Sequence, residues 1–190
     1  MASVERTYAE ALFSLLESEN PNQDSDKSEF DKVLELLKIT NEGFAATPEI
    51  FKFMNTPTIS VQEKLTLIDS AFGEKVGSYV NNFLRLLVVK KRMSHFPQIY
   101  IAFRELYNEH FDIAEITVTS AMPIDIAQKM KIVAQMAKIT GKAEDRIVFN
   151  EKIDKSLIGG VIVDYGNTRL DGSVKTRLAE LSKNIAGTIA

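Results

Sequence analysis

The period of the hydrophobic pattern changes once along this 190-residue chain, near Asp112. Before that point apolar residues recur every three or four positions, as on one face of an amphipathic helix. Just after it, in the run Ile116–Thr119, apolar and polar β-branched residues alternate, which is typical of a half-buried strand. The sequence therefore predicts an α+β protein with two domains, a helical one over residues 1–112 and a small mixed α/β one over residues 113–190.

The two predicted domains also differ in charge. Residues 1–112 carry 12 Lys and Arg and 17 Asp and Glu, a net charge of −5, whereas residues 113–190 carry 11 and 9, a net charge of +2. Opposite net charges are compatible with two domains that contact different partners. The whole chain carries −3, so it has no overall positive field to attract nucleic acid, and we predict no nucleic-acid partner.

The first domain is predicted to contain six amphipathic helices with short connections, for which an antiparallel bundle is the natural packing. Local signals place the helix starts: Ser3 is a candidate N-cap, Thr47-Pro48 combines a cap with a proline at the first helical position, and Ser60–Glu63 is a capping box. A polar linker is expected over Asn20–Asp26, and the second helix is expected to stop near Gly43.

The second domain is predicted to contain a strand, a helix, a strand, a β-hairpin and a C-terminal helix. Val161–Val163 is β-branched, Gly166-Asn167 supplies the positive φ that a two-residue hairpin loop needs, and Val174–Ile185 returns to a helical period. We interpret Gly159-Gly160 as a tight backbone turn and Asp171–Ser173 as a strand exit followed by an N-cap. The residues on which this local structure depends are Gly159, Gly160, Gly166, Asp171, Gly172 and Ser173.

Few residues offer catalytic or metal-binding chemistry. The chain has no cysteine, and its two histidines, His95 and His110, lack ligand spacing. Gly159-Gly160 resembles the start of a phosphate loop but lacks the Gly-Lys-Ser/Thr ending, and Asp171–Ser173 has no histidine near in sequence to act as a base. We therefore predict no catalytic residue, no metal ion and no cofactor.

Membrane signals are weak as well. No apolar run approaches the roughly 18–20 residues that span a bilayer. Lys90–Arg92 contains three cations, fewer than the roughly four to eight of a lipid-binding patch, and is better explained as a solvated helix end. The helical pattern begins by Val4, which we expect to leave no room for a leader peptide. With Met1 taken as the native start, the sequence predicts a protein that is made in and stays in the cytoplasm, with no membrane span of its own.

Four segments, taken in order, resemble one known family. They are Arg6–Phe13, Asn82–Leu87, Ile116–Ala121 and the longer stretch GGVIVDYGNTRLDGSVKTRLAEL that begins at Gly159. Together they resemble the δ subunit of bacterial F-type ATP synthases, a family that includes the mitochondrial oligomycin-sensitivity-conferring protein. The resemblance covers nearly the whole chain.

The resemblance implies a function that composition and spacing alone do not. It implies a non-catalytic stator subunit that links the catalytic head to the peripheral stalk, so that rotor torque drives ATP synthesis coupled to proton transport. The helical domain would bind the N-terminal helix of one α subunit in a groove between its first and fifth helices. The second domain would bind the C-terminal end of the b-subunit stalk, at the cytoplasmic face of the bacterial membrane. The expected groove residues are Tyr8, Ala11, Leu12, Leu15, Tyr79, Val80, Phe83 and Leu87.

Two other classes of protein stay open on the residues alone. One is a stand-alone helical scaffold or adaptor with no part in ATP synthesis. The other is an enzyme that uses the Gly159-Gly160 turn to hold a phosphorylated ligand.

Overall fold

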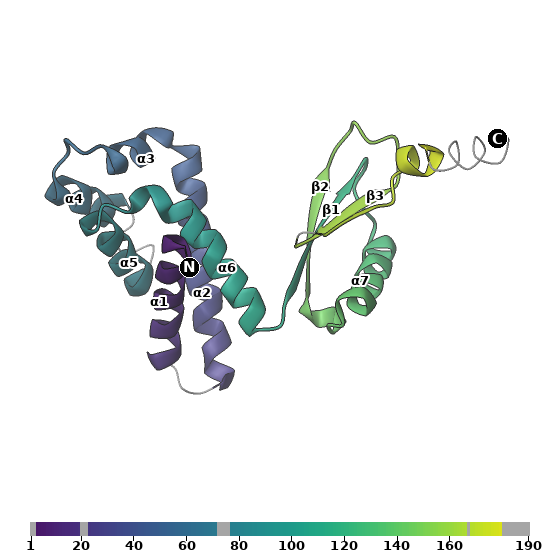
Figure 1. The fold of residues 1–190 in the computed structure, drawn as a ribbon, viewed down its shortest axis with the longest axis horizontal. Helices are drawn as coiled ribbons and strands as arrows, with labels where there is room; N and C mark the ends of the chain where they lie inside the picture. The colour runs from purple at the N-terminus through teal and green to yellow at the C-terminus, as the bar shows by residue number, and fades with distance from the viewer. Residues whose placement is uncertain (1–2, 20–22, 72–76, 167, 180–190) are drawn as a thin grey trace. The chain divides into compact units, whose positions relative to one another are not determined.

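A computed structural model describes residues 3–19, 23–71, 77–166 and 168–179. The chain divides into two compact units, residues 1–107 and residues 108–190 (Figure 1). Helices fill the first unit, and a four-stranded mixed sheet with helical segments forms the second. The predicted α+β class is confirmed.

The first unit is built on aromatic packing between helices distant in sequence. Its elements are α1 (Val4–Glu19), α2 (Gln23–Ala46), α3 (Pro48–Asn55), α4 (Val61–Ala71), α5 (Gly77–Val89), a 3₁₀ turn (Met93–His95) and α6 (Phe96–His110). The ring of Phe13 on α1 lies 4.6 Å from Phe30 on α2 and 5.8 Å from Phe103 on α6. These three side chains are buried, so the core joins the beginning of the unit to its end.

The predicted helix starts are largely confirmed because they depend on neighbouring residues only. The Arg6 N–H donates to Ser3 Oγ at 3.3 Å. In the capping box, the Ser60 N–H donates to Glu63 Oε2 at 3.0 Å and the Glu63 N–H donates to Ser60 Oγ at 3.2 Å. Thr47 occupies the N-cap position of α3, as predicted, but its side chain makes no capping hydrogen bond there.

Two predicted helix ends are wrong, both in α2. The expected linker Asn20–Asp26 overlaps the helix, because α2 begins at Gln23. The expected stop at Gly43 is passed, and α2 continues to Ala46. Phe44 supplies the reason: it is 4% exposed and its ring lies 5.5 Å from Phe96, so tertiary packing outweighs the roughly 1 kcal/mol cost of a glycine within a helix.

The second unit forms a sheet in the order β2-β1-β3-β4. Its elements are β1 (Ala114–Ser120), α7 (Ile126–Thr140), a 3₁₀ turn (Glu144–Arg146), β2 (Ile147–Ile153), β3 (Val161–Tyr165) and β4 (Thr168–Asp171). β1 and β2 run parallel, which requires a crossover, and α7 provides it; the remaining pairs are antiparallel. Residues 174–179 are helical after β4, whereas Leu181 and Ile185 of the predicted C-terminal helix lie outside the described residues.

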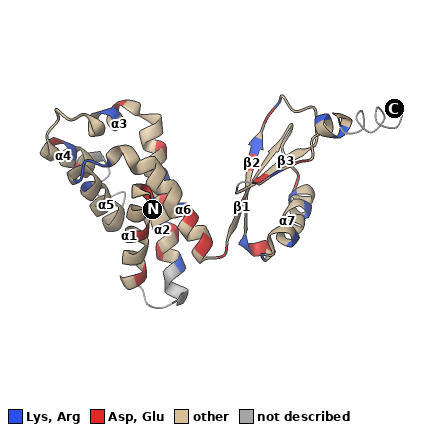
Figure 2. Ribbon diagram, viewed as in Figure 1, with Lys and Arg blue, Asp and Glu red and all other residues tan. Residues whose placement is uncertain are grey.

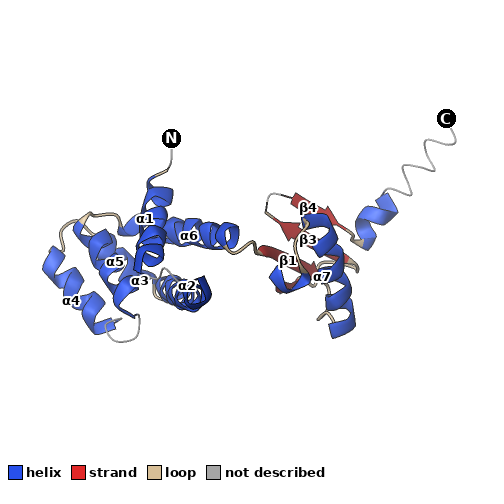
Figure 3. Ribbon diagram, turned by 90° about the horizontal axis from the view of Figure 1, so that it is seen from below, coloured by secondary structure: helices blue, strands red, loops and turns tan. Residues whose placement is uncertain are grey.

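Helix α7 covers one face of the sheet (Figure 3). Ile116 and Val118 on β1, Val163 on β3 and Met136 on α7 form the buried cluster between the two layers. Asp125 caps α7 by accepting the Gln128 N–H at 2.7 Å. The core of this unit is small, so its stability depends strongly on local backbone structure.

The charge difference between the two halves is visible on the ribbon. Figure 2 shows acidic positions spread along α1, α2 and α6, whereas Lys and Arg dominate α7. The two units therefore differ in how their charged residues are distributed along the helices.

Residues 1–112 are expected to fold as an isolated fragment, because the aromatic core of the first unit lies wholly within them. Calorimetry on the fragment should show one cooperative transition with an unfolding enthalpy of about 80 kcal/mol. Circular dichroism should show a helical spectrum before the transition. A helical but non-cooperative fragment would contradict the assignment of an independent core.

Candidate functional site

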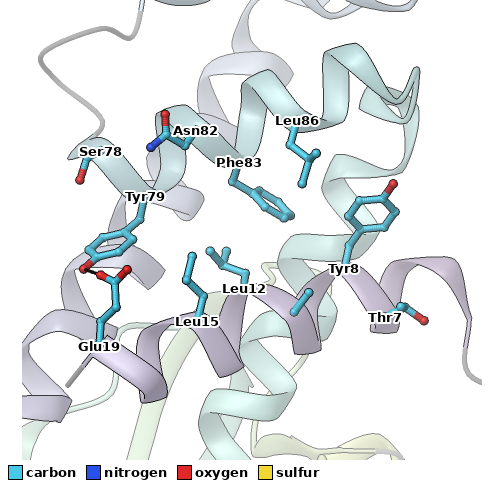
Figure 4. A pocket seen from close by; sticks show the side chains of 11 residues that line it. Thr7, Tyr8, Leu12, Leu15, Glu19, Ser78, Tyr79, Asn82, Phe83 and Leu86 are labelled. Atoms are coloured by element: carbon cyan, nitrogen blue, oxygen red, sulfur yellow. Dashed lines mark hydrogen bonds between the residues drawn. The ribbon is translucent and has the colours of Figure 1, made fainter. Parts of the chain in front are cut away.

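An apolar groove of about 510 Å³ runs between α1 and α5. Its side chains come from these two helices alone, and Figure 4 shows them facing one another across the opening. The lining residues are Thr7, Tyr8, Ala11, Leu12, Leu15, Glu19, Ser78, Tyr79, Asn82, Phe83 and Leu86. Its floor and rim are mainly hydrocarbon and aromatic, which is the chemistry that receives an amphipathic helix.

The groove exists because each of the two helices carries a second apolar stripe beside its core stripe. On α1, Ala9, Phe13 and Leu16 are buried in the core. Tyr8, Leu12 and Leu15 repeat that spacing one residue earlier and line the groove. Leu12 is only 3% exposed and forms part of the floor, whereas Leu15 is 44% exposed at the rim.

Helix α5 repeats this arrangement. Val80, Leu84 and Leu87 are each 0% exposed and face the core. The stripe Tyr79, Phe83 and Leu86, again one residue earlier, faces α1 across the groove. Leu86 is 42% exposed, so a large apolar side chain lies open on each wall.

A contact between side chains of α1 and α5 marks each end of the groove. At one end the rings of Tyr8 and Phe83 meet edge to face, with centroids 6.4 Å apart. At the other end the Tyr79 hydroxyl donates a hydrogen bond to Glu19 Oε2 at 2.5 Å (Figure 4). This hydrogen bond raises the pKa of the Tyr79 hydroxyl above its usual value, so the phenol stays protonated as a donor.

Six of the eight residues expected in the groove line it: Tyr8, Ala11, Leu12, Leu15, Tyr79 and Phe83. Val80 and Leu87 do not, because they belong to the core stripe of α5. Sequence reasoning missed Leu86, although its position three residues after Phe83 and seven after Tyr79 is the helical signal for the groove stripe. It also missed the polar lining residues Thr7, Glu19, Ser78 and Asn82, which no apolar pattern would reveal.

A second groove, of about 470 Å³, lies in the small unit between α7 and the segment around β3 and β4. Its lining residues are Ile132, Gln135, Met136, Ile139, Gly160, Val161, Val163, Leu170, Gly172, Val174 and Arg177. Ile139 is 54% exposed, and Leu170 and Val174 are 37% and 38% exposed. This groove therefore also offers open apolar side chains.

One wall of the second groove depends on a close backbone contact at Gly160. The Gly172 N–H donates to the Val161 carbonyl at 2.9 Å, and the Val174 N–H donates to the Gly159 carbonyl at 3.0 Å. Gly160 has φ of +81°, and a Cβ there would lie 2.4 Å from the Gly172 carbonyl oxygen. At the position of the predicted tight turn the backbone bends, with a positive φ at Gly160, and the close approach of residues 172–174 explains why glycine is required.

Asp171 and Ser173 cap the helical segment that begins at Val174. Ser173 Oγ accepts the Thr176 N–H at 3.3 Å, while the Asp171 carboxylate accepts the Ser173 N–H at 2.8 Å and the Thr176 hydroxyl at 2.9 Å. These hydrogen bonds, that of the Ser173 N–H above all, lower the pKa of Asp171. The interpretation of this motif as a cap is confirmed. Gly166 has φ of +53° in the hairpin loop, as predicted, and Asn167 lies outside the described residues.

The remaining polar residues serve packing and local structure. His95 Nδ1 lies 2.6 Å from Glu5 Oε1, and the His110 ring meets Phe111 edge to face at 4.7 Å. Within the described ranges, no three His, Asp or Glu side chains gather as a metal site would require. None of the described helices combines the length and the apolar character needed to cross a bilayer.

The helical unit and the mixed-sheet unit each carry an apolar groove. Two separate grooves of this kind are typical of a binding or scaffold subunit with two partners. A family model described as the ATP synthase delta (OSCP) subunit matches residues 4–185. The chain belongs to this family.

Bacterial relatives agree with that assignment. The chain is 32% identical over 183 residues to ATP synthase subunit delta of Clostridioides difficile (strain 630), covering 96% of each chain. It is 33% identical over 184 residues to ATP synthase subunit delta of Prochlorococcus marinus (strain MIT 9301), covering 97% of each chain. A chain in the cryo-EM structure of the Toxoplasma gondii mitochondrial ATP synthase hexamer shares the fold, with a TM-score of 0.66, 21% identity and coverage of 97% of this chain and 98% of that one.

The family fixes the kind of protein this is. Its members are non-catalytic components of the peripheral stalk of F-type ATP synthase, and the chain is such a structural subunit of a membrane-associated complex, not an enzyme. The stand-alone adaptor is therefore not favoured. The Gly159-Gly160 turn has a structural explanation in its backbone contacts with residues 172–174.

Gly160→Ala is expected to destabilise the small unit by about 2–4 kcal/mol, because the new Cβ meets both an unfavourable φ and the Gly172 carbonyl. Gly141→Ala is the matched control: Gly141 has φ of +71° with no atom within 4 Å of a new Cβ, so only about 1–2 kcal/mol should be lost. Calorimetry of the full chain measures both changes. Equal losses would mean that the close approach at Gly160 carries no free energy of its own.

The Asp171 cap is expected to make stability depend on pH. Because the folded pKa lies below the unfolded value, the carboxylate stabilises the fold above about pH 4, and this contribution is lost as the pH falls through the folded pKa. Asp171→Asn should therefore lower the melting temperature at about pH 7 and lower it less at about pH 3. Asp145→Asn is the control, since that carboxylate is 79% exposed. A difference that does not change with pH would refute this role.

Proposed function

We propose that the chain connects the catalytic head of the synthase to its peripheral stalk through two separate grooves. The six-helix N-terminal bundle binds the N-terminal helix of one α subunit between α1 and α5. The small domain, residues 113–190, binds the C-terminal end of the b-subunit stalk. In this arrangement the protein lies peripherally on the cytoplasmic face of a bacterial membrane.

The observation that carries the proposal is the apolar lining of the groove between α1 and α5, with Leu15 44% and Leu86 42% exposed on opposite walls. Large apolar side chains opposite one another in a preformed groove are suited to the apolar stripe of an amphipathic helix. Such a helix places anchors at positions i, i+3 or i+4, and i+7, the same spacing as Tyr8, Leu12 and Leu15 on the wall that it would contact.

The groove of the small unit supports a second helical partner. Ile139, Leu170 and Val174 are exposed around it, and Leu178, on the same helical segment as Val174, is 58% exposed. Leu178 and Val174 are four residues apart and so share one helix face. These exposed apolar side chains suit the coiled-coil end of a stalk better than they suit a small polar ligand.

A stator requires slow release as well as affinity, because the rotor exerts torque on it continuously. A nanomolar dissociation constant corresponds to about 12 kcal/mol of binding free energy, and most of the variation among related complexes lies in the dissociation rate. Fully desolvated apolar anchors at the centre of an interface are the usual source of slow dissociation. Both grooves offer such anchors.

Two matched variants test this division of partners. Leu86→Glu places a carboxylate on the wall of the first groove, and we expect it to weaken binding of a synthetic α-subunit N-terminal peptide at least about ten-fold while stalk binding is unchanged. Ile139→Glu should do the reverse with a soluble b-stalk fragment. Ile101→Glu is the control: Ile101 is 44% exposed on α6 and lies outside both grooves. Calorimetry on the full-length chain measures all three.

Each outcome of this comparison is informative. If Leu86→Glu leaves the α peptide bound with unchanged affinity, the groove between α1 and α5 is not its site. If Leu86→Glu weakens the stalk and Ile139→Glu weakens the peptide, the two partners are assigned to the wrong units.

A further inference from the structure

The groove between α1 and α5 has a single charged side chain among its described lining residues, that of Glu19. Glu19 is the last residue of α1 and lies at the end of the groove opposite Tyr8 (Figure 4). The apolar floor made by Leu12 and Phe83 ends before it is reached. A helix that covers the floor must therefore also cover, or pass beside, one carboxylate.

Among the described residues, the Glu19 carboxylate is held in place by a hydrogen bond and has no cationic partner. The Tyr79 hydroxyl donates to its Oε2, which fixes the side chain across the end of the groove without adding positive charge. Other carboxylates of α1 have cationic or titratable partners: Glu10 pairs with Arg6 at 3.0 Å, and Glu5 contacts His95. Within the described part of the chain, Glu19 has no such ion pair, so its charge faces whatever fills the groove.

We propose that Glu19 is a specificity determinant that receives a Lys or Arg side chain of the bound helix and fixes the register of that helix. The inference rests on the proposed function of the groove, and it adds the position of one charge to that function. Tyr8 and Glu19 are eleven positions apart, which corresponds to about 16 Å along a helix. The partner helix should therefore carry its apolar anchors over about two turns and the cation about one turn beyond the last anchor.

The register of the bound helix follows from the free-energy cost of binding in a shifted register. A helix shifted by one turn would move its cation away from Glu19, and burying a carboxylate without a compensating charge is unfavourable. A cation at that position instead forms a charge-assisted pair at the rim. Because the other described lining residues are uncharged, this one charge distinguishes correct from shifted binding.

The test uses the full-length chain and a synthetic peptide of the first ~20 residues of the α subunit from the same genome, a length that exceeds the ~11 residues the groove accommodates. Glu19→Gln should weaken binding about five-fold at low salt, and the difference should shrink at about 0.5 M salt, where charges are screened. Glu17→Gln, an equal loss of charge on the same helix outside the groove lining, should change affinity less than about two-fold.

Two further arms separate charge from structure. Tyr79→Phe removes the hydrogen bond to Glu19 but keeps the carboxylate, and it should retain the salt-dependent part of the affinity. The cations of the peptide are then replaced by Gln one at a time. One replacement should weaken binding to the unaltered chain about five-fold and have no effect on the Glu19→Gln variant, as a double-mutant cycle requires.

Three results would overturn the inference. If the peptide binds and the Glu19→Gln and Glu17→Gln variants have equal affinity for it, Glu19 does not determine specificity, although the groove assignment stands. If Tyr79→Phe weakens binding as much as Glu19→Gln at every salt concentration, Glu19 acts through the local structure and not through its charge. If the unaltered chain does not bind the peptide at all, the groove assignment fails and the inference fails with it.

Discussion

Helices α1 and α5 each carry more apolar surface than one core contact can bury. On both helices a second apolar stripe lies one residue before each position of the core stripe. The two stripes together are wider than the face that a single neighbouring helix covers. Burial of Val80, Leu84 and Leu87 on α5 therefore turns Tyr79, Phe83 and Leu86 outward, toward α1. The groove is a geometric consequence of how the core is packed.

The aromatic core then keeps this groove in shape. Phe13 on α1 is held between Phe30 and Phe103, so α1 cannot rotate without disturbing α2 and α6. A groove that exists before its partner arrives loses little conformational entropy on binding. For a subunit of a stator, such a preformed site favours affinity and slow release together. The stability of the first unit and the strength of its proposed contact thus have a common origin.

The residues show which features a sequence can predict and which it cannot. The caps at Ser3, Ser60 and Asp125 and the hairpin glycine were predictable, because each depends on residues within a few positions. The end of α2 was not, since the packing of Phe44 against Phe96 carries the helix past Gly43.

The groove itself was predictable only in part. Apolar periodicity identifies α1 and α5 and most of the lining, but two stripes one residue apart lie only about 100° apart on a helix. Sequence alone therefore placed Val80 and Leu87 in the groove and omitted Leu86, because only the positions of the neighbouring helices decide which stripe is covered.

In the small unit the groove depends on the backbone and not on a side-chain pattern. Gly160 is explained by a backbone contact with Gly172, which aligns Val174 and Arg177 along the second groove. One wall of this second groove is held by main-chain hydrogen bonds of 2.9 and 3.0 Å. Because the backbone has only two freely rotating dihedral angles per residue, such a wall deforms less under load than one built from side chains.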